Sequence, residues 1–196
     1  MTTYDSAYMA RHGYANESAE RVEMKRAQLA LIERITRVEN LLVAGAACGT
    51  EVRAATALGI AATGFDLHAE PGSGVLTGDL SDPATWPAGD FDCLVAIDVL
   101  EHVPEDRLFN IGIGLLDRRF PWLALAISKD AGHEGHVTLW PLSLWAAWLR
   151  GLGYDLVAAP ASLRPDEEAT YGIRTFDACW RSNNPSGAIL FWRLRG

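Results

Sequence analysis

Short apolar runs alternate with longer amphipathic stretches along most of the chain. The short runs are typical of buried strands, and the longer stretches space their apolar residues as helices do. The runs predict strands at Leu41–Gly45, Ala61–Asp66, Val75–Thr77, Phe91–Ile97, Trp122–Ser128, Tyr154–Ala158 and Gly187–Arg193. The amphipathic stretches predict helices at roughly 17–38, and at Thr50–Leu58, Glu105–Asp117 and Ser143–Arg150. Strands and helices in this order are typical of a mostly parallel sheet with helices on both faces.

The first predicted helix has a start signal and an apolar face. Asn16 is the expected N-cap, and acidic residues follow it in the first turn. The face expected to be buried carries Met24, Ala27, Leu31, Ile35 and Val38.

Composition and charge narrow the classes of partner. The chain has 196 residues, of which 49% are hydrophobic, which suits one globular domain. Its formal charge of −8 and its pI of about 5.1 disfavour binding to bulk nucleic acid and favour a small or neutral partner. Cys48, Cys93 and Cys179 form no CxxC pair, so neither a disulfide framework nor a zinc site is indicated.

The same sequence features predict a location. No apolar run approaches the length of about 18 residues that a membrane span needs, and the N-terminal segment lacks the apolar core of a signal peptide. We therefore expect a cytoplasmic protein of bacterial origin that does not contact a membrane. The oligomeric state is left open.

The turn after the first strand, VAGAACGTE from Val43 to Glu51, consists largely of small residues. A strand, a small-residue turn and a helix N-terminus allow a ligand to approach backbone amides. A dinucleotide fingerprint would need glycines at positions 45, 47 and 50, and the chain has Gly45, Ala47 and Thr50. The pattern G-x-G-x-G is matched at Gly45 and Gly49, with Ala47 between them. A tight turn without a ligand is the open alternative.

Acidic residues follow the next strands. Asp66 ends the second strand, where a carboxylate can accept hydrogen bonds from both hydroxyls of a ribose. Asp79 follows the third strand and could accept from the exocyclic amine of adenine. The alternatives are a solubilising surface residue for Asp66 and a helix cap for Asp79.

The fourth strand leads directly into a cluster of ionisable residues. The segment FDCLVAIDVLEHVPEDRL places Asp98 at the end of the strand, followed by Glu101 and His102 and then by Pro104. Ionisable groups at such a position are used in a site or solvated.

In this order and spacing, these segments resemble class I S-adenosylmethionine-dependent methyltransferases, over roughly residues 40–153. The DVLEHVP stretch looks closest to the small-molecule branch that includes the ubiquinone-type O-methyltransferases. The resemblance implies an α/β fold: a single Rossmann-like domain with a mostly parallel seven-stranded sheet, an antiparallel last strand and helices on both faces. Residues 1–38 would form an N-terminal helical lid and residues 39–196 the S-adenosylmethionine-binding methyltransferase domain.

The resemblance also implies the cofactor contacts. The loop would lie under the methionine portion, Asp66 would bind the ribose, Asp79 and Leu80 would lie by the adenine, and Asp98 would lie beside the sulfonium. The full predicted set is Gly45, Ala46, Ala47, Gly49, Asp66, Leu67, Asp79, Leu80 and Asp98. Two departures from the family pattern, Val43 in place of an acid and Ala47 in place of a glycine, leave the affinity in question.

Histidines are the natural candidates for a catalytic base, because their pKa lies near neutral pH. His136, in the loop after the fifth strand, and His102 are the predicted bases, and deprotonation without either is the alternative. Related methyltransferases bind a divalent ion with a comparable set, which here would be Glu101, His102 and His136. Glu101 and His102 are adjacent in sequence, which does not place both naturally on one face, so a metal is an alternative and not the expectation.

The predicted function is S-adenosylmethionine-dependent methyl transfer to an oxygen or nitrogen of a small-molecule acceptor. The alternative is a methyltransferase-like partner subunit that binds the cofactor without turnover of its own, which Val43 and Ala47 favour. A nicotinamide oxidoreductase is disfavoured by the missing glycine at position 50.

Overall fold

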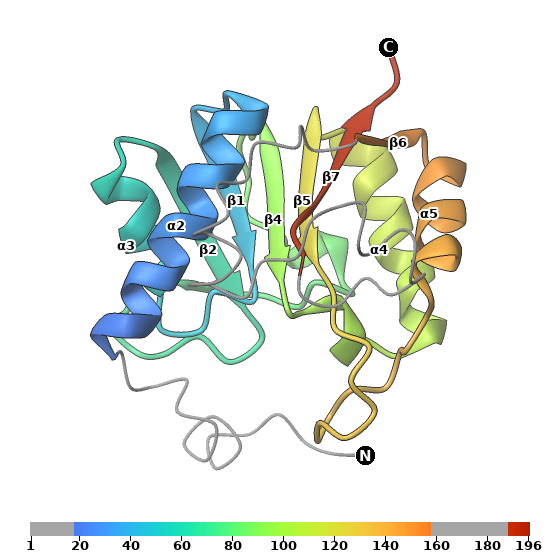
Figure 1. Cartoon of the computed structure of the whole chain (residues 1–196), viewed down its shortest axis with the longest axis horizontal. Coiled ribbons are helices and arrows are strands. Elements are labelled where there is room, and N and C mark those ends of the chain that lie inside the picture. Colours follow the sequence, from blue (N-terminus) through green and yellow to red (C-terminus); the bar gives the residue numbers. More distant parts are fainter. Residues whose placement is uncertain (1–17, 158–187) are drawn as a thin grey trace. The chain divides into compact units, whose positions relative to one another are not determined.

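The structure, a computed structural model, describes residues 18–157 and 188–196. Its strands form a seven-stranded sheet in the order β3-β2-β1-β4-β5-β7-β6, flanked by helices (Figure 1). The strands β1 and β2 pair in parallel, as do β2 and β3, whereas β7 runs antiparallel to both β5 and β6. The predicted Rossmann-like α/β fold with an antiparallel last strand is confirmed.

The observed elements lie close to the predicted ones. The strands are β1 (Asn40–Ala44), β2 (Ala61–Asp66), β3 (Leu76–Thr77), β4 (Cys93–Ile97), β5 (Trp122–Ala126), β6 (Tyr154–Val157) and β7 (Leu190–Leu194). The α-helices are α2 (Ala19–Thr36), α3 (Thr50–Ala57), α4 (Glu105–Arg118) and α5 (Leu142–Gly151). Two short 3₁₀ turns, η1 (Pro83–Thr85) and η2 (Leu100–His102), were not predicted.

The chain groups into two compact units, Met1–Leu94 and Val95–Gly196, with the boundary inside β4. In the first unit, α2 covers β1 and β2 and packs beside α3 (Figure 1). The predicted division into a lid of residues 1–38 and a domain of residues 39–196 stays a prediction, and residues 1–17 lie outside the described part of the chain.

The start and the buried face of α2 differ from the prediction. Ser18, not Asn16, is the N-cap, and its hydroxyl accepts a hydrogen bond from the Arg21 amide at 3.1 Å. Leu31 and Val38 are buried as predicted, whereas Met24, Ala27 and Ile35 are only half-buried. The buried side chains of α2 are Lys25, Gln28, Leu29, Leu31, Ile32 and Thr36, so the buried face is rotated from the one predicted. The rotation has a physical reason, because Lys25 forms a buried ion pair with Glu51 of α3 at 2.8 Å.

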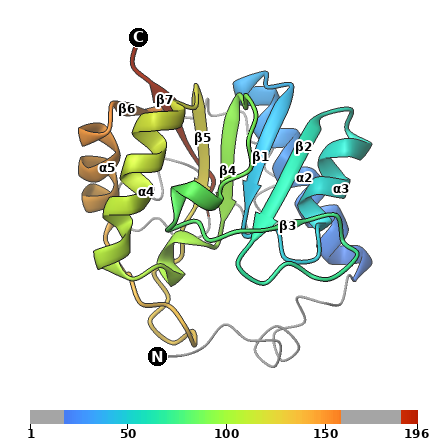
Figure 2. The same ribbon diagram turned by 180° about the vertical axis from the view of Figure 1, so that it is seen from behind.

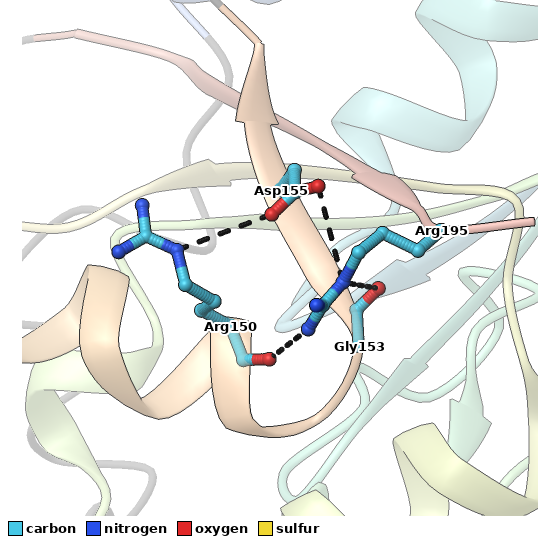
Figure 3. Close-up of polar contacts among 4 residues, drawn as sticks. All are labelled: Arg150, Gly153, Asp155 and Arg195. Atoms are coloured by element: carbon cyan, nitrogen blue, oxygen red, sulfur yellow. Dashed lines mark hydrogen bonds and ion pairs between the residues drawn. The ribbon is translucent and has the colours of Figure 1, made fainter.

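In the second unit, α4 and α5 lie side by side (Figure 2). Gly112 of α4 makes this packing close, since a β-carbon there would lie 3.3 Å from Leu152 and 3.9 Å from Trp148. Arg195, which follows β7, is held at the turn between α5 and β6 by the carbonyls of Arg150 and Gly153 and by the Asp155 carboxylate (Figure 3). These side chains are exposed, so this ion pair contributes at most about 1 kcal/mol.

Within residues 18–157 and 188–196, no helix combines the length and the apolar character that crossing a bilayer requires.

Candidate active site

The loop after β1 adopts the backbone conformation that a glycine-rich ligand loop needs. Gly45, Ala47 and Gly49 all have positive φ, at 70°, 44° and 81°. Gly49 also begins α3 as its N-cap. Glycine adopts this left-handed region freely, whereas the β-carbon of Ala47 is strained there. The middle position of the predicted G-x-A-x-G loop is therefore a true glycine position occupied by alanine.

Replacing Ala47 by glycine is expected to stabilise the fold by about 1 kcal/mol, because the strain at positive φ is removed. Binding of S-adenosylmethionine should stay the same or tighten. Denaturant unfolding and calorimetric titration measure the two quantities. Ala46→Gly is the matched control: Ala46 is fully buried and has no positive φ, so that change should destabilise the protein. A destabilised Ala47→Gly chain would contradict the prediction.

Asp66 is tied directly to this loop. One carboxylate oxygen accepts a hydrogen bond from the Ala47 amide at 2.9 Å, and the other accepts from the His68 amide at 2.7 Å. Each carboxylate oxygen can accept a further hydrogen bond. The structure thus brings the predicted ribose-binding acid to the predicted loop, with acceptor capacity left for two hydroxyls.

Close packing at Gly64 holds β2 against the loop and α3. A β-carbon at Gly64 would lie 2.7 Å from Val52 and 2.8 Å from the Ala46 side chain. No side chain larger than hydrogen fits without a shift of these neighbours. This glycine therefore fixes how close Asp66 and the loop lie.

The residues predicted to lie by the adenine are partly engaged in contacts within the protein. One oxygen of Asp79 accepts both the amide and the hydroxyl of Ser81, at 2.8 and 2.7 Å. Leu80 is buried, and its carbonyl accepts the Trp86 indole N–H, whereas Leu67 is exposed. The helix-cap alternative for Asp79 is wrong, because the N-cap of η1 is Asp82, whose side chain accepts the Ala84 amide at 3.2 Å. The role of Asp79 beside the adenine stays a prediction.

In the second unit, Asp98 has a strained backbone. Its φ is 57°, and its amide donates to the Ala126 carbonyl at 2.9 Å. A non-glycine residue in the left-handed region is uncommon and such residues cluster at functional sites. Asp98 directly follows β4, as predicted, and its role beside the sulfonium stays a prediction.

Glu101, His102 and His136 converge immediately after Asp98. One ligand atom from each lies within 4.8 Å of the others, and Glu101 is fully buried. The sequence-based objection that adjacent residues do not share a face is wrong here. The loop carrying His136 is anchored on the Glu101 carbonyl, which accepts the amides of Val137 at 2.8 Å and Thr138 at 3.0 Å.

Both histidines of this cluster are oriented by backbone carbonyls. The Nδ1 of His102 lies 3.1 Å from the Gly135 carbonyl, and the Nδ1 of His136 lies 2.8 Å from the Asp130 carbonyl. A carbonyl only accepts, so Nδ1 is the donor in each ring and Nε2 carries the lone pair. This is the arrangement that metal-binding histidines adopt.

The electrostatics of the cluster favour a cation. Oε1 of Glu101 accepts the Ser128 amide at 2.7 Å, and its buried Oε2 has no hydrogen-bond partner in the described part of the chain. Burial, with the nearby Asp98 charge, raises the pKa of Glu101 to about 8. Burial, with the neighbouring His136 and His133, lowers the pKa of His102 to about 3. Burial likewise lowers the pKa of His136.

These pKa shifts predict how the stability of the metal-free protein depends on pH. Between 4.5 and about 8, folded Glu101 keeps a proton that the unfolded chain loses, so stability falls as pH rises. Between about 3 and 6.5, the unfolded chain protonates His102 and the folded chain does not, so stability rises with pH. The two effects oppose each other between pH 4.5 and 6.5, and above pH 6.5 only the fall due to Glu101 remains.

We therefore expect the free energy of unfolding, measured with a chelator present, to decrease from pH 6.5 to pH 8. The Glu101→Gln variant should lack this decrease. If Glu101→Gln showed the same decrease in stability, a titratable group other than Glu101 would be its cause.

His133 is a member of this site that the sequence analysis did not single out. Its ring stacks on that of His136, with the centroids 4.3 Å apart and the planes at 20°, and it faces His102 edge-on at 5.9 Å. The H-x-x-H spacing of His133 and His136 was the available signal. Of the other histidines, His68 lies beside Asp66, and His12 lies outside the described residues.

No family model matches the chain, and no curated protein is similar to it in sequence. Solved structures are similar in fold. Magnesium protoporphyrin IX methyltransferase from Synechocystis has a TM-score of 0.60 at 15% identity, over 79% of this chain and 87% of that one. An S-adenosylmethionine-dependent methyltransferase from Archaeoglobus fulgidus has a TM-score of 0.60 at 14% identity, over 96% and 97%.

A third similar structure is a complex between the Trm112 methyltransferase activator of Haloferax volcanii and a methyltransferase. Its TM-score is 0.62 at 16% identity, over 98% of this chain and 99% of that one. At such low identities the similarity shows the fold alone. The chain has the fold of S-adenosylmethionine-dependent methyltransferases.

Proposed function

We propose that this protein transfers a methyl group from S-adenosylmethionine to an oxygen of a small acceptor, with a divalent metal ion bound by Glu101, His102 and His136. The observation that carries the proposal is the convergence of Glu101 and His102, which follow β4, with His136, which follows β5, in a methyltransferase fold. Nitrogen acceptors fit the fold equally well. The metal-binding geometry is what favours oxygen.

The first unit supplies the groups that would bind the cofactor. The left-handed backbone at Gly45, Ala47 and Gly49 lets a ligand approach the loop closely, and Asp66 offers a fixed carboxylate for the ribose hydroxyls. Because the leaving group of a sulfonium is good, the protein mainly has to bind and align the reactants. The loop and Asp66 would do this for S-adenosylmethionine.

The second unit offers side chains that would fit a divalent metal ion. The orphaned Oε2 of Glu101 and the two Nε2 lone pairs provide one carboxylate and two imidazole donors. This mixed set suits first-row transition ions such as Mn²⁺ or Co²⁺ better than Mg²⁺, which prefers oxygen donors. When bound, such an ion holds acceptor oxygens and lowers the pKa of a hydroxyl.

This assignment uses His102 and His136 as ligands in place of the predicted bases. A histidine whose pKa is about 3, as for His102, is a weak base at neutral pH but stays neutral and able to bind a metal. The hydroxyl proton of the acceptor would pass to solvent water. The oxygen would then form a bond with the methyl carbon as the carbon–sulfur bond breaks, and S-adenosylhomocysteine would leave.

The net charge of −8 favours a small acceptor over a polynucleotide. Two adjacent oxygens on the acceptor would suit a metal ion that Glu101, His102 and His136 would hold. A cofactor-binding partner subunit without turnover is the second candidate, favoured by the strained Ala47 in the cofactor loop.

The test measures cofactor binding and turnover separately. Calorimetric titration with S-adenosylmethionine is expected to show binding. Transfer of a labelled methyl group to a dihydroxybenzene should require Mn²⁺ or Co²⁺, stop with a chelator, and be weak with the monohydroxy analogue. Binding without transfer to any acceptor would favour the partner subunit, and transfer to an oligoribonucleotide alone would overturn the small acceptor. No binding at millimolar cofactor would overturn the proposal.

A further inference from the structure

His136 differs from the other two members of the cluster in how it is supported. Glu101 and His102 lie on the 3₁₀ turn η2, whereas His136 lies in a loop without regular secondary structure. Its side chain is half-buried. A ligand in such a loop keeps its orientation only through the contacts of its own ring and of the loop around it.

The loop around His136 is closed at both ends on Glu101. At one end the Ser128 amide donates to the Glu101 carboxylate, and at the other the Val137 and Thr138 amides donate to the Glu101 carbonyl. Inside the loop, the Ser128 hydroxyl accepts a hydrogen bond from the Asp130 amide at 3.2 Å. The Asp130 carbonyl accepts a hydrogen bond from the Nδ1 of His136. These bonds fix one edge of the His136 ring but not the tilt of its plane.

The ring of His133 supplies the missing restraint. It lies against a face of His136 at 4.3 Å and 20°, while His102 meets His136 edge-on at 4.6 Å and 71°. The Nδ1 of His133 lies 2.7 Å from the carbonyl of Glu134, the next residue in the chain. His133 is not among the residues whose ligand atoms lie within 4.8 Å of one another.

We propose that His133 is a positioning residue, whose stacked ring holds His136 in the orientation that binds the metal. The inference rests on the proposed function, since it takes the Glu101, His102 and His136 cluster as a metal site. Its physical basis is the face-to-face contact of two flat rings, which only another flat ring can replace. We therefore expect metal binding to depend on a flat ring at position 133 and not on the nitrogens of that ring.

The test compares His133→Ala with His133→Phe in the full chain, with Co²⁺ as the probe. His133→Ala should bind Co²⁺ about tenfold more weakly than the unsubstituted protein, the size of effect seen when a metal ligand loses an outer support. His133→Phe keeps a stacked ring and should bind within about threefold of the unsubstituted protein. Equal binding by His133→Ala overturns the proposal. Equal weakening in both variants also overturns it, because the nitrogens would then be what matters.

A second readout needs no metal. Nitrogen NMR of the His136 imidazole should report a single tautomer, protonated at Nδ1, in the unsubstituted chain and in His133→Phe. In His133→Ala the signal should change to that of exchanging tautomers. If the unsubstituted chain binds no Co²⁺, the metal part of the proposed function fails. The NMR comparison still decides the positioning role, and an unchanged His136 signal in His133→Ala overturns it.

Discussion

Replacing Glu101 by glutamine is expected to abolish divalent-metal binding while leaving the binding of S-adenosylmethionine unchanged. Glutamine keeps the size of the side chain and a carbonyl oxygen that can accept the Ser128 amide. It removes the negative charge, which is the only one among the three predicted ligands. We expect the affinity for Co²⁺ to fall by more than about 100-fold, beyond the range for an outer-shell partner. Titrations with Co²⁺ and with S-adenosylmethionine measure the two effects.

Glu105→Gln is the matched control for this variant. Glu105 lies close by in sequence, is exposed, and accepts the Trp140 indole N–H at 2.7 Å, but it does not belong to the cluster. Its replacement should leave metal binding unchanged. Wild-type Co²⁺ affinity in Glu101→Gln would remove the carboxylate from the ligand set and with it the metal site proposed above.

The chemistry at Glu101 also explains why a protein would keep such a residue. A fully buried carboxyl with an unpartnered oxygen is unfavourable in the folded chain, as its pKa of about 8 indicates. A bound cation compensates for the burial of the charge. Glu101→Gln is therefore expected to be at least as stable as the parent chain at pH 8 without metal, and less stable than the parent chain with it.

The parts of the fold that depend on local patterns could be predicted from the sequence. The order of strands and helices follows from apolar periodicity. The meeting of Asp66 with the Gly45–Gly49 loop follows because the carboxyl ends of neighbouring parallel strands share one edge. The match of Ala47 to a glycine position was visible in the G-x-G-x-G pattern, whereas its left-handed backbone was found only in the structure.

The parts that depend on tertiary contacts could not be predicted in this way. Lys25 is buried in α2 only because Glu51 meets it from another helix. Glu101 and His102 converge with His136 because distant backbone amides bind the Glu101 carbonyl, which no periodicity encodes. The stacking of His133 on His136 likewise depends on how a loop without regular structure folds on itself.

Replacing Asp66 by alanine is expected to weaken the binding of S-adenosylmethionine at least tenfold, which is about 1.4 kcal/mol. The carboxylate is held by the Ala47 and His68 amides, so it is fixed before a ligand arrives. Its loss removes the acceptors for the ribose hydroxyls and also frees the loop at Ala47. Calorimetric titration with S-adenosylmethionine measures the effect.

Asp92→Ala is the control that separates the loss of the ribose acceptors and of the loop contact from a general loss of stability. Asp92 also accepts two backbone amides in the same unit, those of Glu39 and Asn40 at 3.0 and 2.9 Å, but at the start of β1. Both variants should lower the free energy of unfolding, because each leaves two amides without their carboxylate. Only Asp66→Ala should weaken cofactor binding, because only Asp66 lies at the end of the strands where the loop is. Normal cofactor binding by Asp66→Ala would mean that the loop and Asp66 do not form the cofactor site.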